Sequence, residues 1–100
     1  MNLTKKAKGE ALTIALEGRL DTTTSPQLDN ELDVSLEGVK DLTLDFSELT
    51  YISSAGLRVL LRAQRKMNGC QGAMRVTGVN DSIMEIFEIT GFDVILTIED

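Results

Sequence analysis

The sequence predicts a small α/β domain, with helices packed on a mostly parallel sheet behind an N-terminal β-hairpin. Strand-like and helix-like patterns alternate along the chain at short spacing, and this alternation indicates right-handed crossovers between parallel strands. The 100 residues fit one domain, and 42% apolar with 26% charged residues is ordinary for a folded protein. We therefore expect a single domain over residues 1–100, with the element order β(β)αβαβαβ.

The first part of the chain predicts a hairpin. Residues 11–17 alternate apolar and polar side chains, which indicates a half-buried strand. Residues 2–8 give a weaker strand signal, and a turn at Gly9-Glu10 would let them pair with residues 11–17. This hairpin is the only antiparallel pairing that the pattern requires.

A helix follows the hairpin. Ser25 before Pro26 is a favourable start, with Ser25 as the N-cap and Pro26 in the first turn. Gly38 is a favourable end. The buried side of this helix is expected to carry Leu28, Leu32, Val34 or Ser35, and Leu36.

The rest of the chain predicts three strands and two helices. The strands are expected at Leu42–Phe46, Ala73–Thr77 and Val94–Ile98, with residues 47–50 as a connection. One helix opens at Ser53-Ser54 and runs to about Met67, with an apolar stripe at helical spacing. The last helix has N-cap candidates at Asn80-Asp81-Ser82, turns Ile83, Ile86 and Phe87 inward, and closes at Gly91.

The composition excludes several kinds of site. The chain has no histidine and one cysteine, Cys70, so a Ser-His-Asp or Cys-His nucleophile and a zinc site built from His and Cys are ruled out. No P-loop or other glycine-rich phosphate loop occurs. We expect no cofactor and no bound metal, and a regulatory binding protein rather than an enzyme.

Charge and hydropathy restrict the partners and the compartment. The net charge of −6 and the four aromatic residues disfavour a nucleic-acid partner. The chain has no apolar run long enough to span a membrane, and residues 1–10 lack the apolar core of a secretory signal. A single cysteine suits a reducing compartment. We therefore expect a cytoplasmic protein without membrane insertion.

The segment Tyr51-Ile52-Ser53-Ser54-Ala55-Gly56-Leu57 is the strongest candidate for a site. It follows a strand and opens a helix, and functional groups of open α/β sheets gather at the carboxyl ends of the strands. A helix N-terminus has unpaired N–H groups and a positive dipole end, which favour a phosphate. The alternative is structural: a serine N-cap, and an Ala-Gly pair that lets the helix pack closely on the sheet.

Two further features lie near this segment. Arg58, Arg62, Arg65 and Lys66 share one helix face, which would suit an acidic partner surface or would simply be solvated. Asp21 ends the strand of the hairpin, so it is expected at the same sheet edge as Ser54. Asp21 could equally cap a turn.

Four segments together resemble one family. They are Gly18-Arg19-Leu20-Asp21, Leu44-Asp45-Phe46-Ser47, Tyr51-Ile52-Ser53-Ser54-Ala55-Gly56-Leu57 and Gly91-Phe92. They are similar to the STAS domain (sulfate transporter and anti-sigma factor antagonist), over about residues 2–98. A chain of this length resembles the freestanding bacterial anti-sigma factor antagonists.

The resemblance implies a phosphoserine switch. The unphosphorylated domain would bind an anti-sigma factor, itself a serine kinase, and so release the sigma factor. The kinase would phosphorylate the first serine of a D-S-S/T-G-L motif, which is Ser54 here, and a phosphatase would reset it. Ser53 stands where the family most often has Asp, and Ala55 replaces the second Ser/Thr. Ser53 is thus the second choice of acceptor.

The site expected from these arguments comprises Asp21, Ser53, Ser54 and Gly56, with Arg58 and Arg62 as a basic flank. The alternative function is a STAS subunit of a larger assembly, such as a lipid-transporting ABC system. In that case the serine would be a helix cap or a packing contact and would not be phosphorylated.

Overall fold

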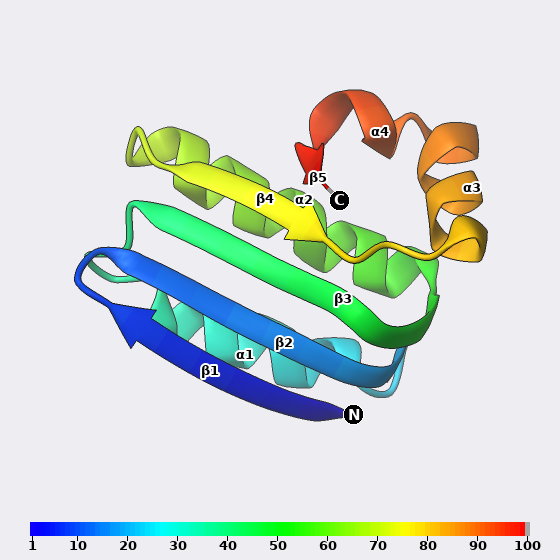
Figure 1. Ribbon diagram of the computed structural model, residues 1–100, viewed down its shortest axis with the longest axis horizontal. Coiled ribbons are helices and arrows are strands. Elements are labelled where there is room, and N and C mark those ends of the chain that lie inside the picture. Colours follow the sequence, from blue (N-terminus) through cyan, green and yellow to red (C-terminus); the bar gives the residue numbers. More distant parts are fainter. Residues whose placement is uncertain (100) are drawn as a thin grey trace.

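The computed structural model describes residues 1–99 as a five-stranded sheet with four helices (Figure 1). The strands are β1 (Asn2–Lys8), β2 (Ala11–Leu20), β3 (Asp41–Ile52), β4 (Ala73–Thr77) and β5 (Ile98–Glu99). The helices are α1 (Ser25–Ser35), α2 (Ser54–Gly69), α3 (Asp81–Thr90) and α4 (Phe92–Ile95). The predicted α/β class with a hairpin and a mostly parallel sheet is confirmed.

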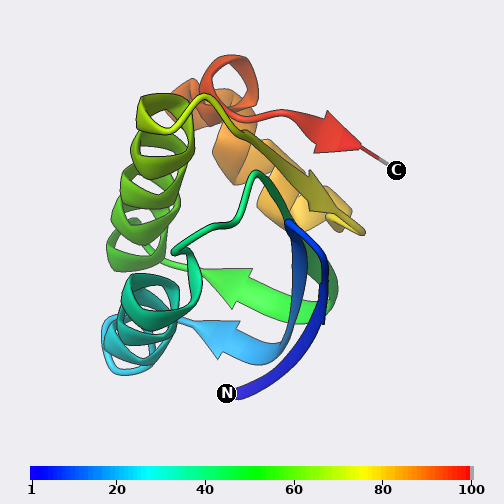
Figure 2. The same cartoon turned by 90° about the vertical axis from the view of Figure 1, so that its left-hand side faces the viewer.

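The strands lie in the sheet in their sequence order. β1 pairs antiparallel with β2, and the other neighbouring strands pair in parallel. Because every parallel crossover steps in the same direction, right-handed connections place successive helices on one face. Figure 2 shows α1 and α2 side by side on that face, while α3 and α4 stand near the β4 and β5 edge.

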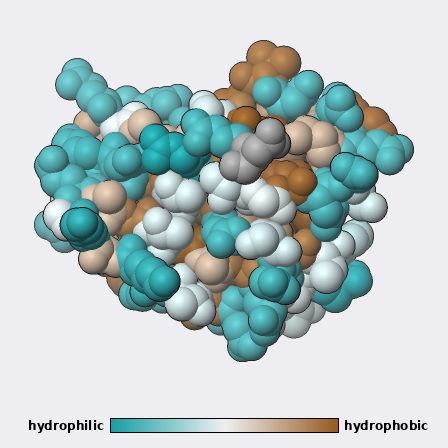
Figure 3. All heavy atoms as spheres, in the orientation of Figure 1, coloured by the Kyte–Doolittle hydropathy of each residue, from teal (hydrophilic) through white to brown (hydrophobic). Residues whose placement is uncertain are grey.

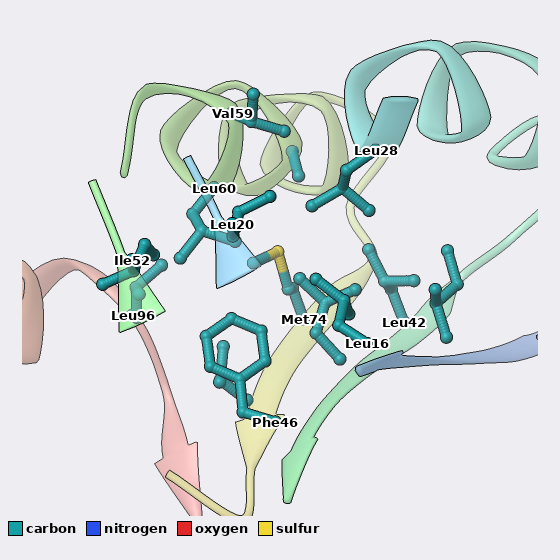
Figure 4. Close-up of a cluster of buried hydrophobic side chains, with 14 of the residues drawn as sticks. Leu16, Leu20, Leu28, Leu42, Phe46, Ile52, Val59, Leu60, Met74 and Leu96 are labelled. Atoms are coloured by element: carbon teal, nitrogen blue, oxygen red, sulfur yellow. The ribbon is translucent and has the colours of Figure 1, made fainter. Parts of the chain in front are cut away.

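The core lies between the sheet and the helices (Figure 4). The alternation predicted for β2 and the start of β3 puts one set of side chains inward, and these are fully buried. Leu28 of α1 and Leu60 of α2 meet them from the helices, and Phe46 packs near Phe87 of α3, with ring centroids 6.4 Å apart. The buried residues in the alternating part of these two strands are Leu12, Ile14, Leu16, Leu42, Leu44 and Phe46.

The predicted boundaries of α1 are corrected by one residue at the start and by about two at the end. Thr24 is the N-cap, and the hydroxyl of Ser25 is buried, where it donates to the carbonyl of Asp21. The helix ends at Ser35, before Gly38. Of the two alternatives for the buried side, Val34 is wrong because it is 77% exposed, whereas Ser35 is half-buried.

The predicted connection at residues 47–50 was also wrong, because β3 continues through it to Ile52. The strand stays paired with β2 across two register shifts, with Glu17 opposite Glu48. Leu49 is buried, and the Thr50 hydroxyl donates to the carbonyl of Gly18. Two local irregularities of the strand pairing thus keep this polar stretch in the sheet.

The last predicted strand, Val94–Ile98, is mostly not a strand. Residues 92–95 form the single turn α4, and within residues 92–99 only Ile98 and Glu99 pair with β4. The turn directs Phe92 and Leu96 toward the core and leaves Val94 86% exposed. Gly91 ends α3 in the left-handed conformation, as expected, and the change of direction there starts the turn.

Candidate functional site

The strands β2 and β3 end side by side, and this relationship positions the candidate site. Leu20 lies opposite Ile52 in the parallel register, and the amide of Ser53 donates to the carbonyl of Leu20 at 2.9 Å. The segments that follow the two strands therefore start at the same edge of the sheet. Asp21 and Ser54 both lie at this edge, where the sequence analysis expected them.

Ser53 is the residue that caps α2. Its backbone is extended, and its carbonyl accepts the first helical bond from the amide of Leu57 at 3.0 Å. Its hydroxyl oxygen accepts from the amide of Gly56 at 3.5 Å, which is long for a hydrogen bond. Ser53 is only partly exposed, so its hydroxyl is engaged at the start of the helix.

Ser54 is the first residue of α2, and it is exposed. Within residues 1–99 its hydroxyl makes no hydrogen bond to another protein group. It stands beside the unpaired N–H groups at the start of a 16-residue helix. The structure therefore separates the two serines: Ser53 holds the helix end, and Ser54 presents a hydroxyl to solvent.

Gly56 is buried, on the side of α2 that faces the strand ends. A methyl group on its Cα would lie 2.8 Å from Cγ1 of Ile52 and 3.0 Å from the carbonyl oxygen of Leu20. Only glycine lets the helix approach the sheet this closely. The structural reading of the Ala55-Gly56 pair is thus confirmed for Gly56, which contributes to the site by positioning α2.

Asp21 organises the loop between β2 and α1. Its carboxylate accepts hydrogen bonds from the amides of Thr23 and Thr24, each at 3.0 Å, and from the Thr24 hydroxyl at 3.1 Å. The amide of Thr24 is the largest of the effects that hold the pKa of Asp21 below its ordinary value. The alternative that Asp21 caps a turn is confirmed, and the turn keeps it beside the start of α2.

The candidate site includes two residues that the sequence pattern did not indicate as site residues, Arg19 and Tyr51. They lie opposite each other in the register of β2 and β3, and the guanidinium of Arg19 stacks over the Tyr51 ring at 4.2 Å. Arg19 also pairs with Asp21 at 3.6 Å. Both residues stand in the quoted motifs, but the stack depends on the two register shifts, which no sequence pattern predicts.

Two of the four cations on the basic face of α2 pair with carboxylates of α1. Arg62 forms an ion pair with Asp29, and Lys66 forms one with Asp33. Within residues 1–99, Arg58 and Arg65 form no ion pair, and Arg58 is exposed. Arg62 is therefore a link between the two helices, whereas Arg58, four residues after Ser54 on the same helix, is exposed.

A shallow groove of about 300 Å³ runs between the first turns of α1 and α2. Pro26 and Asn30 line it from α1, and Ala55 and Arg58 line it from α2. Among residues 1–99, no three His, Cys, Asp or Glu side chains cluster as metal ligands would. No helix in that range is both long and apolar enough to cross a membrane. The arrangement offers a hydroxyl, a short groove and a cation at one surface.

Comparison with known proteins gives the family. A family model described as "Mlab, STAS domain" matches residues 3–97. The chain belongs to the STAS domain family. The resemblance noted in the sequence is thereby confirmed, and two of the segments that carry it, residues 18–21 and 51–57, contain residues of the site just described.

Two relatives connect this STAS domain with regulatory proteins. BtrV of Bordetella bronchiseptica, provisionally assigned as an anti-sigma factor antagonist, is 34% identical over 93 residues, which are 92% of this chain and 80% of BtrV. An anti-sigma-B factor antagonist of Listeria monocytogenes is 30% identical over 97 residues, which are 95% of this chain and 84% of that protein.

The solved structures of Bacillus SpoIIAA share the fold of this STAS domain. The unphosphorylated form, an anti-sigma factor antagonist, has a TM-score of 0.79, and the phosphorylated form has 0.78. Each is 17% identical to this chain and covers 99% of it, and the match covers 88% and 92% of those chains.

Proposed function

We propose that this STAS domain is an anti-sigma factor antagonist that is switched off by phosphorylation at Ser54. The unphosphorylated domain binds an anti-sigma factor serine kinase and thereby releases the sigma factor. A phosphatase removes the phosphate. The observation that carries this proposal is the exposed, unengaged hydroxyl of Ser54 at the first position of α2. The names of the curated relatives support the same function.

The choice of Ser54 over Ser53 rests on their different surroundings. A kinase must place the acceptor oxygen in its own active site, and the hydroxyl of Ser54 faces solvent. The Ser53 hydroxyl accepts from the amide of Gly56, so a phosphoryl group on it would disturb the cap of α2. Ser53 remains the second acceptor because its side chain is also partly exposed.

The fold is expected to tolerate the phosphate. A phosphoserine carries about −1.5 to −2 charges at pH 7. At the start of α2 this charge meets the positive end of the helix dipole and free N–H groups, which stabilise an anion. The SpoIIAA structures include a phosphorylated form with the same fold, which supports this expectation.

The phosphate would switch the domain off by weakening its binding to the partner. In the complex the phosphate would be removed from water, and an uncompensated buried charge costs about 3–5 kcal/mol. About 1.4 kcal/mol already lowers the affinity tenfold. A single modification is therefore sufficient to release the partner while the domain stays folded.

The proposed partner surface surrounds Ser54. Asp21 holds the neighbouring loop, Gly56 sets the depth of α2, and Ser53 fixes its first turn. Arg58 supplies a cation for an acidic group of the partner, and Arg62 flanks it while paired with Asp29. The domain acts as a binding protein and as the substrate of a kinase, without catalysis of its own, and we place it in the cytoplasm.

The second candidate is a STAS subunit of a larger assembly, such as a lipid-transporting ABC system. The observation in its favour is the structural use of Ser53 as a helix cap, which needs no phosphorylation. The two functions predict different partners. Affinity capture would yield a soluble serine kinase for an antagonist and a membrane ATPase for the assembly subunit.

The deciding experiment is mass spectrometry of the intact protein purified from its own host. An antagonist gives a fraction with one phosphate, and fragmentation places it on Ser54. The Ser54→Ala variant loses the phosphate, while the matched Ser53→Ala variant keeps it. Phosphate on Ser53 would reassign the acceptor, and no phosphate under any growth condition would contradict the switch.

A further inference from the structure

The net charge of the chain is concentrated in its last quarter. Residues 76–100 contain six acidic residues and no Lys or Arg. Since the whole chain has 16 acidic and 10 basic residues, residues 1–75 hold ten of each and are neutral on balance. The entire formal charge of −6 thus belongs to the segment that carries α3, α4 and β5.

The same segment exposes large apolar side chains. Ile89 at the end of α3 is 77% exposed, and Val94 and Ile95 of α4 are 86% and 45% exposed. In Figure 3 apolar atoms reach the surface at the upper right, over α3 and α4, with hydrophilic atoms between and around them. The exposed acidic residues of these helices are Asp81, Glu85, Glu88 and Asp93.

These apolar side chains do not serve the core. The inner side of α3 is formed by Ile83 and Phe87, which are fully buried, and α4 is fixed by the half-buried Phe92. A single exposed apolar residue needs no explanation. Here three such residues lie on two consecutive helices whose charged residues are all acidic. These helices therefore expose apolar and acidic side chains together, which is typical of an interaction site.

We propose that the outer side of α3 and α4, the C-terminal acidic surface, docks a basic amphipathic segment of a partner protein. Ile89, Val94 and Ile95 would contact its apolar side, while Glu85, Glu88 and Asp93 would face its Lys or Arg residues. The charge selects this occupant, because two copies of an acidic surface repel each other. Nucleic acid and anionic lipid are repelled in the same way. This interface is separate from phosphorylation of Ser54 and does not depend on it.

The test uses two synthetic amphipathic peptides of about 18 residues, or five helical turns. One is built from Leu and Lys and the other from Leu and Glu, with the same spacing. Each is titrated into the isotopically labelled chain while the backbone amide signals are followed by NMR. We expect the cationic peptide alone to bind, to shift the amides of α3 and α4, and to lose affinity as salt is added.

The test variant carries Ile89→Ser and Val94→Ser together, and the single substitution Val34→Ser is its matched control. Val34 is as exposed as Ile89 but lies on α1, so all three substitutions leave the core intact. The double variant should bind the cationic peptide about tenfold more weakly, and Val34→Ser should bind like the wild type. The proposal is overturned if shifts centre elsewhere, if the double variant binds unchanged, or if the anionic peptide binds equally. Self-association through this surface in sedimentation would overturn it as well.

Discussion

Gly56 lies so close to Ile52 that a methyl group on its Cα would be 2.8 Å from Cγ1 of that residue. Replacing Gly56 with Ala therefore forces α2 away from the ends of β2 and β3. We expect a net loss of about 1–2 kcal/mol, because overpacking exceeds the gain in helix propensity. Urea unfolding measures this change in the free energy of unfolding, and Gly69→Ala is the control.

Gly69 is the last residue of the same helix, and a Cβ there would meet nothing within 4 Å. The Gly69→Ala variant should be as stable as the wild type or slightly more stable. Equal effects of the two substitutions would show that the close approach at Gly56 is unimportant for stability.

The two adjacent serines are expected to differ in their effect on stability. Ser53→Ala removes the helix cap, and since the bond to the Gly56 amide is long, we expect a loss of about 0.5–1 kcal/mol. Ser54→Ala removes an exposed hydroxyl and should change stability by less than about 0.5 kcal/mol. Thermal unfolding of both variants tests this order, and a larger loss at Ser54 would contradict the assignment of the cap.

The carboxyl group of Asp21 is expected to titrate below 3.8, its ordinary value, because the Thr24 amide and its neighbours stabilise the ionised form. A lowered pKa in the folded state adds stability above the unfolded pKa, and that stability is lost as the pH falls through the folded pKa. The difference in stability between the wild type and Asp21→Ala should accordingly narrow below about pH 4.

Carbon NMR of the Asp21 carboxyl group measures this titration directly. Thr24→Val removes the hydroxyl donor and keeps the amide, so it should raise the pKa of Asp21 only part of the way to 3.8. A wild-type midpoint at or above 3.8 would contradict the role of Asp21 in the loop.

The link between α1 and α2 should be weak and sensitive to salt. Arg62 pairs with Asp29 and Lys66 with Asp33, but both cations remain substantially exposed. A double-mutant cycle with Arg62→Ala and Asp29→Ala is expected to give a coupling of about 0.2–1 kcal/mol that shrinks in salt. Arg58→Ala with Asp29→Ala is the control pair, and equal coupling there would contradict a specific contact.

The amount of structure that the sequence could predict differs from region to region. The alternation in β2 and the left-handed cap at Gly91 depend on neighbouring residues, so their predictions were confirmed. The continuation of β3 through Leu49 depends on pairing with β2, and the exposure of Val94 depends on one helical turn. Neither of these two features can be predicted from a short periodic pattern of apolar residues.

The candidate site follows the same division. The position of Ser54 at a helix start was predictable, because a strand signal precedes it and a helical stripe follows. The ion pair of Arg62 was not, because spacing on one helix does not reveal a partner on another. The position of the candidate site was therefore easier to predict from the sequence than the ion pairs that its charged residues form.

The charge at position 54 should decide which partners the domain retains. Tagged wild type, Ser54→Ala and Ser54→Asp are compared in affinity capture from the host, with quantitative mass spectrometry of the retained proteins. Ser54→Ala should retain the same serine kinase as the wild type, since the lost hydroxyl leaves the surface uncharged. Ser54→Asp should retain about tenfold less, because a carboxylate must be desolvated in the complex. The matched Ser82→Asp variant places the same charge at an exposed position of the first turn of α3 and should bind normally. If Ser54→Asp and Ser82→Asp retain the kinase equally, the effect is one of net charge and Ser54 is not at the interface.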